Sequence, residues 1–150
     1  MCGIVGVFSY AGPAVRPENI VAMRDCLIHR GPDGAGLWLS PDGRIGLGHR
    51  RLSIIDLSDA AAQPMGNEDG AVQVVFNGEI YNYRELRAEL QSLGHIFQTR
   101  TDTEVLLHAY AEWGTDALPK LVGMFAFAML DRGRRQVVLV RSEEHMSELQ

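Results

Sequence analysis

The chain has 150 residues, of which 46% are hydrophobic and 22% charged, and its formal net charge at pH 7 is −5. These values describe one globular domain large enough to bury a core, and the negative charge argues against nucleic acid or an anionic membrane as the main partner. The first nine residues lack the features of a secretory signal, and no apolar run approaches the roughly 20 residues that a membrane span needs. We therefore expect a cytoplasmic protein with free thiols at Cys2 and Cys26.

The first part of the chain predicts a strand, a helix and a hairpin. The apolar run "IVGVFS" is typical of a strand, and Pro17 suits the first position of a helix. That helix continues through apolar residues at helical spacing, Ile20, Met23 and Leu27, and the glycines of "HRGPDGAG" end it. The segments 36–39 and 44–49 flank "SPDG", in which Pro41 and Gly43 fit a type I turn, so we expect a β-hairpin.

Two further helices are predicted in the second part of the chain. Asn82 fits the N-cap of the first, with Glu85 three residues on and Gly94 at its end. The apolar face of this helix comprises Leu86, Leu90 and Leu93. Thr101 and Glu104 fit a capping box at the start of the second helix. Its apolar face comprises Leu106, Tyr110 and Trp113.

The predicted strands of this part join through short turns. "AVQVVF" is typical of a buried strand that ends at the turn "NGE", and "GMFAFAML" predicts a central strand buried on both faces. The turn "DRGRR" leads from it into the strand "QVVLV". Short turns favour antiparallel pairing, so we expect an α+β sandwich with helices outside and sheets inside. The glycines of "GLGH" precede a strand and not a helix, which argues against a phosphate-binding loop.

Cys2 directly follows the initiator methionine. Removal of that methionine would leave one residue with both a thiol and a free α-amine. Because an α-amine has a pKa of about 7.7–8.0, it can accept the proton of the thiol near neutral pH. Cys2 is therefore a candidate N-terminal nucleophile, and a buried structural thiol is the alternative.

Three other segments supply groups that such a nucleophile needs. The side-chain amide of Asn77 and the backbone N–H of Gly78 can stabilise an oxyanion, unless "NGE" is only a turn. Arg50 or Arg51 can bind a carboxylate with two parallel hydrogen bonds. Asp102 can bind an ammonium group, or it only favours the start of its helix. Together these groups suit an α-amino acid with a side-chain amide, which is glutamine. A metal site at Cys26, His29 and His49 is a weaker alternative, because no tight ligand pairs complete a zinc pattern.

Several longer motifs carry a family resemblance. They are "MCGIVGVF", "HRGPDGAG", "GHRRLSIIDLS", "QPM", "VVFNGEIYNYRELRAEL", "TRTDTEVLLHAYAEWG" and "GMFAFAMLD". Over residues 1–141 the chain resembles the class II glutamine amidotransferase domain of glutamine-hydrolysing asparagine synthetases. The resemblance implies the four-layer αββα sandwich of N-terminal nucleophile hydrolases.

The same resemblance implies a role for each matching residue. Cys2 corresponds to the nucleophile, and Asn77 and Gly78 to the oxyanion hole. Substrate-binding positions correspond to Arg51, Leu52, Ile54, Glu79 and Asp102. A glutamyl thioester would form on Cys2 and be hydrolysed to glutamate, releasing ammonia. The domain itself would need no metal and no cofactor. In the family, a synthetase domain that uses ATP and Mg²⁺ passes this ammonia to aspartate, giving asparagine.

The chain departs from the family pattern after Arg141. Residues 142–150, "SEEHMSELQ", are polar where the family continues with a strand, so we expect a C-terminally truncated glutaminase domain at 1–141 and a tail foreign to the family. The expected partners are glutamine, a C-terminal synthetase domain and, as a possible assembly, a second copy in a homodimer. Two alternatives stay open, namely an amidotransferase that acts on a peptide, antibiotic or polysaccharide, and an inactive remnant.

Overall fold

The computed structural model describes residues 2–53 and 58–143. Its strands are β1 (Gly3–Phe8), β2 (Gly34–Leu39), β3 (Ile45–Arg51), β4 (Met65–Gly66), β5 (Val72–Ile80), β6 (Gly123–Asp131) and β7 (Gln136–Arg141). Its helices are α1 (Pro17–Asp25), α2 (Tyr83–Ser92) and α3 (Asp102–Trp113), and short 3-10 helices cover Asp59–Ala61 and Gly114–Lys120. Within the described ranges, no helix combines the length and apolarity that crossing a bilayer requires.

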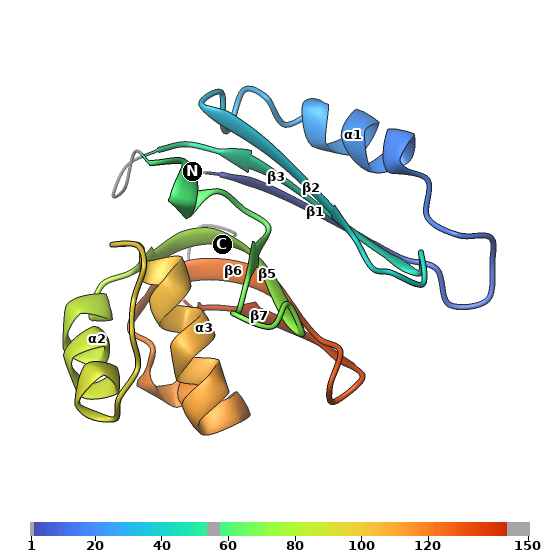
Figure 1. Ribbon diagram of the computed structural model, residues 1–150. Coiled ribbons are helices and arrows are strands. Elements are labelled where there is room, and N and C mark those ends of the chain that lie inside the picture. The colour runs from blue at the N-terminus through green and yellow to red at the C-terminus, as the bar shows by residue number, and fades with distance from the viewer. Residues whose placement is uncertain (1, 54–57, 144–150) are drawn as a thin grey trace.

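These elements form four layers (Figure 1). Strands β1, β3 and β2 form one sheet in that order, and β4, β5, β6 and β7 form the other. Helix α1 covers the outer face of the first sheet, while α2 and α3 cover the outer face of the second (Figure 1). All of these strand pairs are antiparallel. The αββα sandwich and the antiparallel pairing predicted from the sequence are therefore confirmed.

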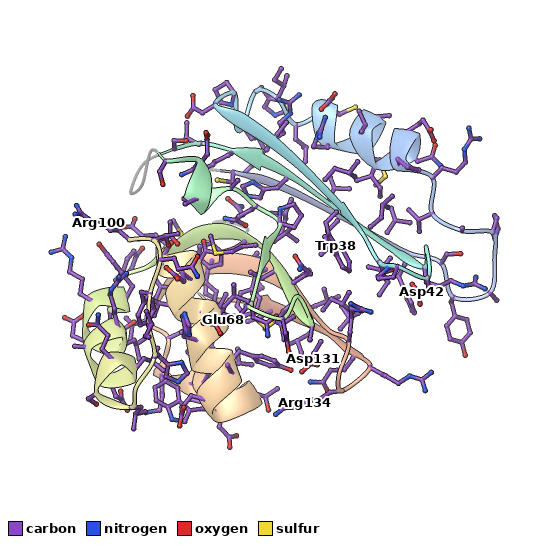
Figure 2. The ribbon with its side chains drawn as sticks, in the orientation of Figure 1. Trp38, Asp42, Glu68, Arg100, Asp131 and Arg134 are labelled. Atoms are coloured by element: carbon purple, nitrogen blue, oxygen red, sulfur yellow. The ribbon has the colours of Figure 1, made fainter. Side chains whose placement is uncertain are left out.

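The first sheet packs closely against α1 because its central strand carries glycine. A Cβ added at Gly46 would lie 2.7 Å from the Ile20 side chain, and one at Gly48 would lie 3.0 Å from it. Ile20 is fully buried in this contact. On the other face of the sheet, Trp38 pairs across the strands with Leu47 and points towards the second sheet (Figure 2). In this half of the molecule, helix α1 and the sheet thus pack closely because glycine leaves no side chain between them.

The second sheet and its helices hold the main hydrophobic core. The buried cluster lies entirely within residues 65–129 and includes Phe76, Leu90, Leu106 and Phe127. Phe76 contacts Phe125 and Phe127 across β5 and β6, with ring centroids 6.2 and 6.3 Å apart. At the far end of β6, the buried Asp131 accepts a hydrogen bond from the Tyr110 hydroxyl of α3 at 3.0 Å. Large side chains and one buried polar link therefore fix α3 on this sheet.

The predicted turn and one helix cap are confirmed. In the β2–β3 hairpin the Gly43 N–H donates to the Ser40 carbonyl at 2.8 Å, and Gly43 has a φ of +66°. At the start of α3 the Thr101 hydroxyl accepts from the Glu104 N–H at 3.1 Å. The Glu104 carboxylate bonds to residues before Thr101, so only half of the predicted capping box forms.

Two predictions of element ends are wrong. Helix α1 ends at Asp25, and Leu27 lies in a turn instead of on the helix. Its position against Gly3 explains this, since a Cβ at Gly3 would lie 2.8 Å from the Leu27 Cβ. Strand β5 runs through "NGE" to Ile80, because β6 pairs with it as far as Gly123. The segment that we expected to be a turn is therefore the end of a central strand.

Three predicted side-chain environments also differ from the structure. Asn82 does not cap α2, because its amide donates to the Lys120 carbonyl at 2.9 Å and accepts from the Val122 N–H at 3.0 Å. Leu93 follows the last residue of α2 and is exposed. Strand β6 is central but buried mainly on the face that carries Phe125, Phe127 and Met129; on the other face Ala126 and Ala128 are half-buried and only Leu130, near the end of the strand, is buried. The second face lies towards the first sheet, where a gap remains near β7.

Candidate active site

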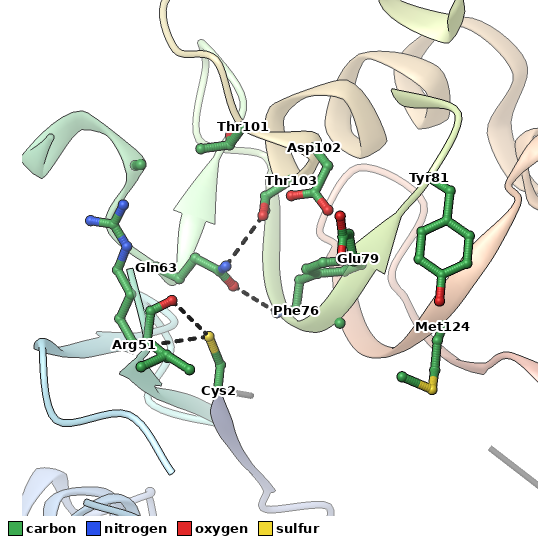
Figure 3. A pocket seen from close by; sticks show the side chains of 13 residues that line it. Cys2, Arg51, Gln63, Phe76, Glu79, Tyr81, Thr101, Asp102, Thr103 and Met124 are labelled. Carbon is green, nitrogen blue, oxygen red and sulfur yellow. Dashed lines mark hydrogen bonds between the residues drawn. The ribbon is translucent and has the colours of Figure 1, made fainter. Parts of the chain in front are cut away.

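A pocket of about 150 Å³ opens between the N-terminal end of the chain, the edge of β5 and the start of α3 (Figure 3). Five of the predicted site residues are among its lining residues together with Cys2, although they come from separate parts of the sequence. The lining residues are Cys2, Arg51, Leu52, Ala61, Gln63, Phe76, Gly78, Glu79, Tyr81, Thr101, Asp102, Thr103 and Met124. The fold therefore gathers most of the candidate residues at one place.

The Cys2 thiol is held by the backbone that follows β3. Its Sγ accepts from the Leu52 N–H at 3.4 Å and lies 3.8 Å from the Leu52 carbonyl oxygen. The Cys2 carbonyl accepts from Arg30 Nε at 3.4 Å, and the next residue, Gly3, pairs with Arg50 of β3. Cys2 is thus held against the sheet and is half-buried at the pocket.

The outer edge of β5 faces the same pocket. Tyr81 N–H donates to the Val122 carbonyl, so the odd-numbered residues of β5 bond to β6 and the even-numbered ones face the other edge. On that edge, Phe76 N–H donates to Gln63 Oε1 at 2.7 Å and Ile80 N–H donates to Asp102 Oδ2 at 3.0 Å. By the same alternation the N–H of Gly78, between these two, faces this edge of β5, and Gly78 is one of the residues that line the pocket.

Gly78 must be a glycine for two reasons. Its φ is +146°, a conformation that L side chains rarely adopt. A Cβ added there would lie 2.2 Å from the Met124 carbonyl oxygen and 2.4 Å from the Phe125 Cα. These are backbone atoms of β6 that cannot move aside without breaking the sheet. The close approach of β5 to β6 therefore fixes the position of this backbone N–H.

Asp102 is the first residue of α3 and is 5% exposed. Burial raises the pKa of its carboxyl above the ordinary value, and the nearby Glu79 charge acts in the same direction. Hydrogen bonds from backbone N–H groups, that of Ile80 among them, oppose this rise. A cation in the pocket would further stabilise the ionised carboxylate, which suits a site for an ammonium group.

Arg51 is the last residue of β3 and lies across the pocket from Asp102 (Figure 3). Leu52 follows it and also lines the pocket. Arg51 Nη1 donates to the Ser58 carbonyl at 2.8 Å, which directs the guanidinium along the pocket wall. Glu79 is exposed at the pocket rim. Ile54, the remaining predicted pocket residue, lies outside the described residues.

Asn77 lies next to Gly78 on β5 but is not among the lining residues. By the alternation of the strand, its side chain points to the opposite face from that of Phe76, towards the first sheet. Its Oδ1 is buried and has no hydrogen-bond partner within the described part of the chain. A buried acceptor without a partner is costly, so this amide has capacity for a further hydrogen bond.

Two buried polar residues lie near the pocket; the sequence analysis gave no role to one of them, Gln63, and considered the other, His49, only as a metal ligand. Gln63 lines it and bonds both to β5 and to Thr103 of α3. His49 is 1% exposed between the sheets, and its Nε2 donates to the Phe76 carbonyl at 3.2 Å. Burial lowers the pKa of His49 to about 4, so the ring is neutral at pH 7. Both lie in motifs that carried the resemblance, "QPM" and "GHRRLS", but no periodicity marks either as part of a site.

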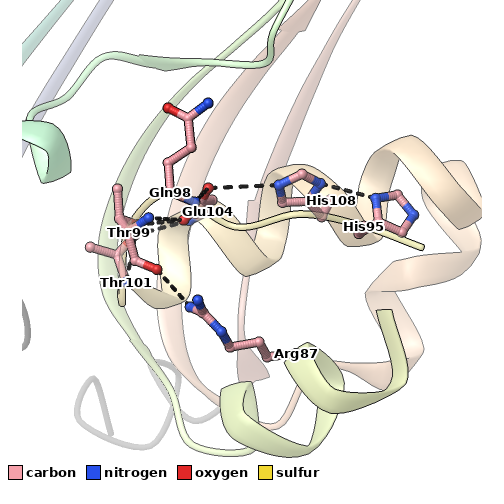
Figure 4. Close-up of polar contacts among 7 residues, drawn as sticks. All are labelled: Arg87, His95, Gln98, Thr99, Thr101, Glu104 and His108. Atoms are coloured by element: carbon pink, nitrogen blue, oxygen red, sulfur yellow. Dashed lines mark hydrogen bonds and ion pairs between the residues drawn. The ribbon is translucent and has the colours of Figure 1, made fainter. Parts of the chain in front are cut away.

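A second polar cluster holds the irregular segment before α3 in place (Figure 4). Glu104 is buried, and its carboxylate accepts from the Gln98 N–H at 2.7 Å and from the Thr99 N–H at 2.7 Å. Arg87 of α2 donates to the Thr99 carbonyl at 2.7 Å. This segment leads directly to Thr101, so these bonds determine where the start of α3 meets the pocket.

The cluster extends to the surface through two histidines. His108 Nε2 lies 3.7 Å from Glu104 Oε1, and its Nδ1 lies 3.0 Å from His95 Nδ1. His95 Nε2 lies 2.8 Å from Glu112 Oε2. Burial, and then the neighbouring His95, lower the pKa of His108. Across residues 2–53 and 58–143, no three His, Cys, Asp or Glu side chains form a group that could hold a metal ion, so Cys26, His29 and His49 do not come together as one.

Comparisons with known proteins agree on one family. A profile of the glutamine amidotransferase domain matches residues 1–146. The chain is 47% identical over 135 residues to asparagine synthetase [glutamine-hydrolyzing] 1 of Bacillus subtilis (strain 168), covering 88% of this chain and 21% of that protein. It is 42% identical over 142 residues to asparagine synthetase [glutamine-hydrolyzing] 2 of Oryza sativa subsp. japonica, covering 94% of this chain and 23% of that protein. The chain thus spans about a fifth of the length of these relatives.

A solved structure matches the fold. Glutamine phosphoribosylpyrophosphate (PRPP) amidotransferase from B. subtilis, complexed with ADP and GMP, superposes with a TM-score of 0.71 at 22% identity. The match covers 86% of this chain and 35% of that chain. It supports the αββα arrangement expected of an N-terminal nucleophile fold. From the profile match over nearly its whole length, the chain belongs to the glutamine amidotransferase domain family.

Proposed function

We propose that the domain hydrolyses glutamine to glutamate and ammonia through a thioester on Cys2. One observation carries the proposal, namely that the thiol shares a pocket of about 150 Å³ with Arg51, Gly78 and Asp102. The pocket therefore has a partner for each functional group of glutamine. The thiol and the oxyanion donor suit the side-chain amide, the guanidinium suits the α-carboxylate, and the buried carboxylate suits the α-ammonium.

The reaction follows from this arrangement. The Cys2 sulfur attacks the side-chain carbonyl carbon, and its proton passes to its own α-amine once the initiator methionine has been removed. The Gly78 N–H stabilises the oxyanion, and the Asn77 side chain, which points towards the first sheet in this structure, would supply a second donor from its Nδ2–H after turning towards the substrate. The α-amine then passes this proton to the amide nitrogen, the carbon–nitrogen bond breaks and ammonia leaves, and water hydrolyses the thioester to glutamate.

The substrate is held at its α-carbon end. Arg51 binds the α-carboxylate, Asp102 with Glu79 binds the α-ammonium, and Leu52 with Ile54 contributes the pocket wall. Glutamine would bring a cation to the buried Asp102 carboxylate, whose ionised form burial disfavours. Binding therefore compensates for a local electrostatic cost of the empty site.

The similarity to known synthetases supports one choice of ammonia acceptor. We infer that this chain is the glutaminase part, over residues 1–141, of a longer cytoplasmic synthetase that uses ATP and Mg²⁺ to convert aspartate to asparagine. The high identity to two glutamine-hydrolysing asparagine synthetases supports this assignment. An amidotransferase with a different acceptor is the alternative, and measuring asparagine formation by the full-length protein separates the two.

The test of the proposed function compares the two cysteines of the chain. In the full-length protein, Cys2→Ser should lower the kcat of glutamine hydrolysis by about 10³-fold or more, because a serine hydroxyl is a far poorer nucleophile under these conditions. Cys26→Ser is the matched control, since Cys26 is exposed and outside the pocket, and its kcat should stay within about twofold. Wild-type turnover by Cys2→Ser would disprove the mechanism.

A further inference from the structure

Gln63 connects the three parts of the molecule that meet at the pocket. Its side-chain oxygen accepts from the Phe76 N–H of β5 at 2.7 Å, and its side-chain nitrogen donates to the Thr103 hydroxyl of α3 at 3.3 Å (Figure 3). Its backbone carbonyl lies against Gly36 of β2, where an added Cβ would come within 1.7 Å of the Gln63 oxygen. One residue therefore contacts the sheet that carries Cys2, the strand that carries Gly78 and the helix that begins with Asp102.

The connection to β5 bears directly on the Gly78 N–H. The free edge of β5 presents three successive N–H groups, from Phe76, Gly78 and Ile80. Gln63 accepts from the first and Asp102 accepts from the third. The two outer donors are thus held by side chains, and this fixes the direction of the donor between them. Gln63 itself is 8% exposed, so it is packed tightly enough to act as a rigid link.

We propose that Gln63 is a positioning residue for glutamine hydrolysis, which sets the Gly78 N–H relative to the Cys2 sulfur. The inference rests on the proposed function. Oxyanion stabilisation depends strongly on geometry, and loss of one such donor lowers kcat by about 10²–10³-fold. A displaced donor loses part of that effect. The loss concerns the transition state, because the substrate carbonyl carries no full negative charge before the attack.

The principal experiment is Gln63→Met in the full-length protein. Methionine preserves the length of the side chain and removes both hydrogen bonds. We expect kcat for glutamine hydrolysis to fall by about 10–100-fold, while KM for glutamine and the inhibition constant of glutamate change less than about threefold. A raised KM with unchanged kcat would overturn the proposal, because Gln63 would then act in substrate binding. Unchanged kcat and KM would overturn it as well.

Gln73→Met is the matched control for this substitution. Gln73 is a second buried glutamine; it lies on β5 itself, on the part of the strand that pairs with Gly66, away from the pocket. Its kcat should stay within about twofold of the wild type. An equal fall of kcat in both variants would show that the loss of any buried glutamine amide in this half of the molecule is sufficient, and would contradict a specific role of Gln63.

Thr103→Val keeps the proposal testable if Gln63→Met does not fold. It removes only the acceptor at the helix end of the link and leaves the bond to Phe76 in place. We expect kcat to fall by about 3–10-fold with KM nearly unchanged, since the link is then held at one end only. No change in kcat would contradict the positioning role. Because Cys2→Ser tests the thiol separately, a failure here with Cys2 still essential refutes this inference and leaves the proposed function standing.

Discussion

The two sheets of the molecule reach a close-packed state by opposite means. The β1–β3–β2 sheet meets α1 across Gly46 and Gly48, so that the backbone of β3 lies directly beneath Ile20. The β4–β7 sheet meets α2 and α3 across large apolar side chains within residues 65–129. One half therefore gains contact by close backbone approach, and the other by burying apolar surface, which stabilises by about 25 cal/mol per Å².

The pocket lies where these two halves meet, and each half supplies a different kind of group. The glycine-rich sheet brings the amino-terminal thiol, held through backbone contacts at Leu52. The densely packed half brings the Gly78 N–H and the Asp102 carboxylate, both attached to elements of the core. The polar groups that must stay fixed during a reaction are thus carried by the half with the most packing, in line with the need for preorganised dipoles.

The largest effect should come from Gly78→Ala, which tests how rigid the dense half is at the pocket. The added Cβ would meet the Met124 carbonyl at 2.2 Å in a backbone conformation that alanine disfavours. We expect either loss of the folded protein or a fall in kcat of at least about 10²-fold, measured by circular dichroism and by glutamate release.

Gly70→Ala is the control for that substitution. Gly70 also has a positive φ, of +69°, but a Cβ added there meets nothing within 4 Å. It should cost about 1 kcal/mol of stability from the backbone conformation alone and leave activity intact. Similar losses in both variants would show that the positive φ, and not the contact with β6, restricts Gly78.

A smaller effect is expected from replacing one buried leucine by alanine in each half and comparing the two losses of stability. Leu106 of α3 and Leu47 of β3 are 1% and 4% exposed. Leu106→Ala should lower the free energy of unfolding by about 3–5 kcal/mol, because its cavity lies within the large cluster and collapses poorly. Leu47→Ala should cost about 2–3 kcal/mol, since fewer large side chains surround it. Urea denaturation measures both, and equal costs would contradict the contrast between the halves.

The last effect depends on pH and concerns His49, which lies between the sheets. Its folded-state pKa is about 4 and its ordinary value is 6.5, so the unfolded chain binds the proton first. The free energy of unfolding should therefore fall as pH is lowered from 6.5 to 4, by up to about 3 kcal/mol. His49→Gln retains a donor for the Phe76 carbonyl and has no titrating group. Its unfolding free energy should depend less on pH in this window, and an unchanged dependence would exclude His49 as the cause.

The sequence predicted the elements well where local chemistry governs them. Pro17 marks the start of α1, and the Thr101 hydroxyl caps α3 as its side-chain chemistry requires. The predicted ends of elements were wrong where contacts with residues distant in the sequence determine them. Strand β5 continues through "NGE" because β6 pairs with it, and Asn82 bonds to residues 120 and 122 instead of capping its own helix.

The candidate site shows the same division. The motifs around Cys2, Arg51, Gly78 and Asp102 were sufficient to name these residues, because each bears a group with a definite chemical use. Gln63 was missed and His49 was considered only as a metal ligand, since the contribution of each is a hydrogen bond to the backbone of β5 that sequence spacing does not reveal. A buried polar side chain can be interpreted only when its partner is known.

By itself, the sequence determined the family, the order of the elements and the chemical groups available, because side-chain identity and short-range periodicity are local properties. Only the tertiary structure decided that the thiol, the Gly78 N–H and the Asp102 carboxylate share one pocket. It also decided which N–H of β5 faces that pocket. The physical reason is that strand pairing and the close approach at Gly78 depend on β6, which begins more than forty residues later in the chain.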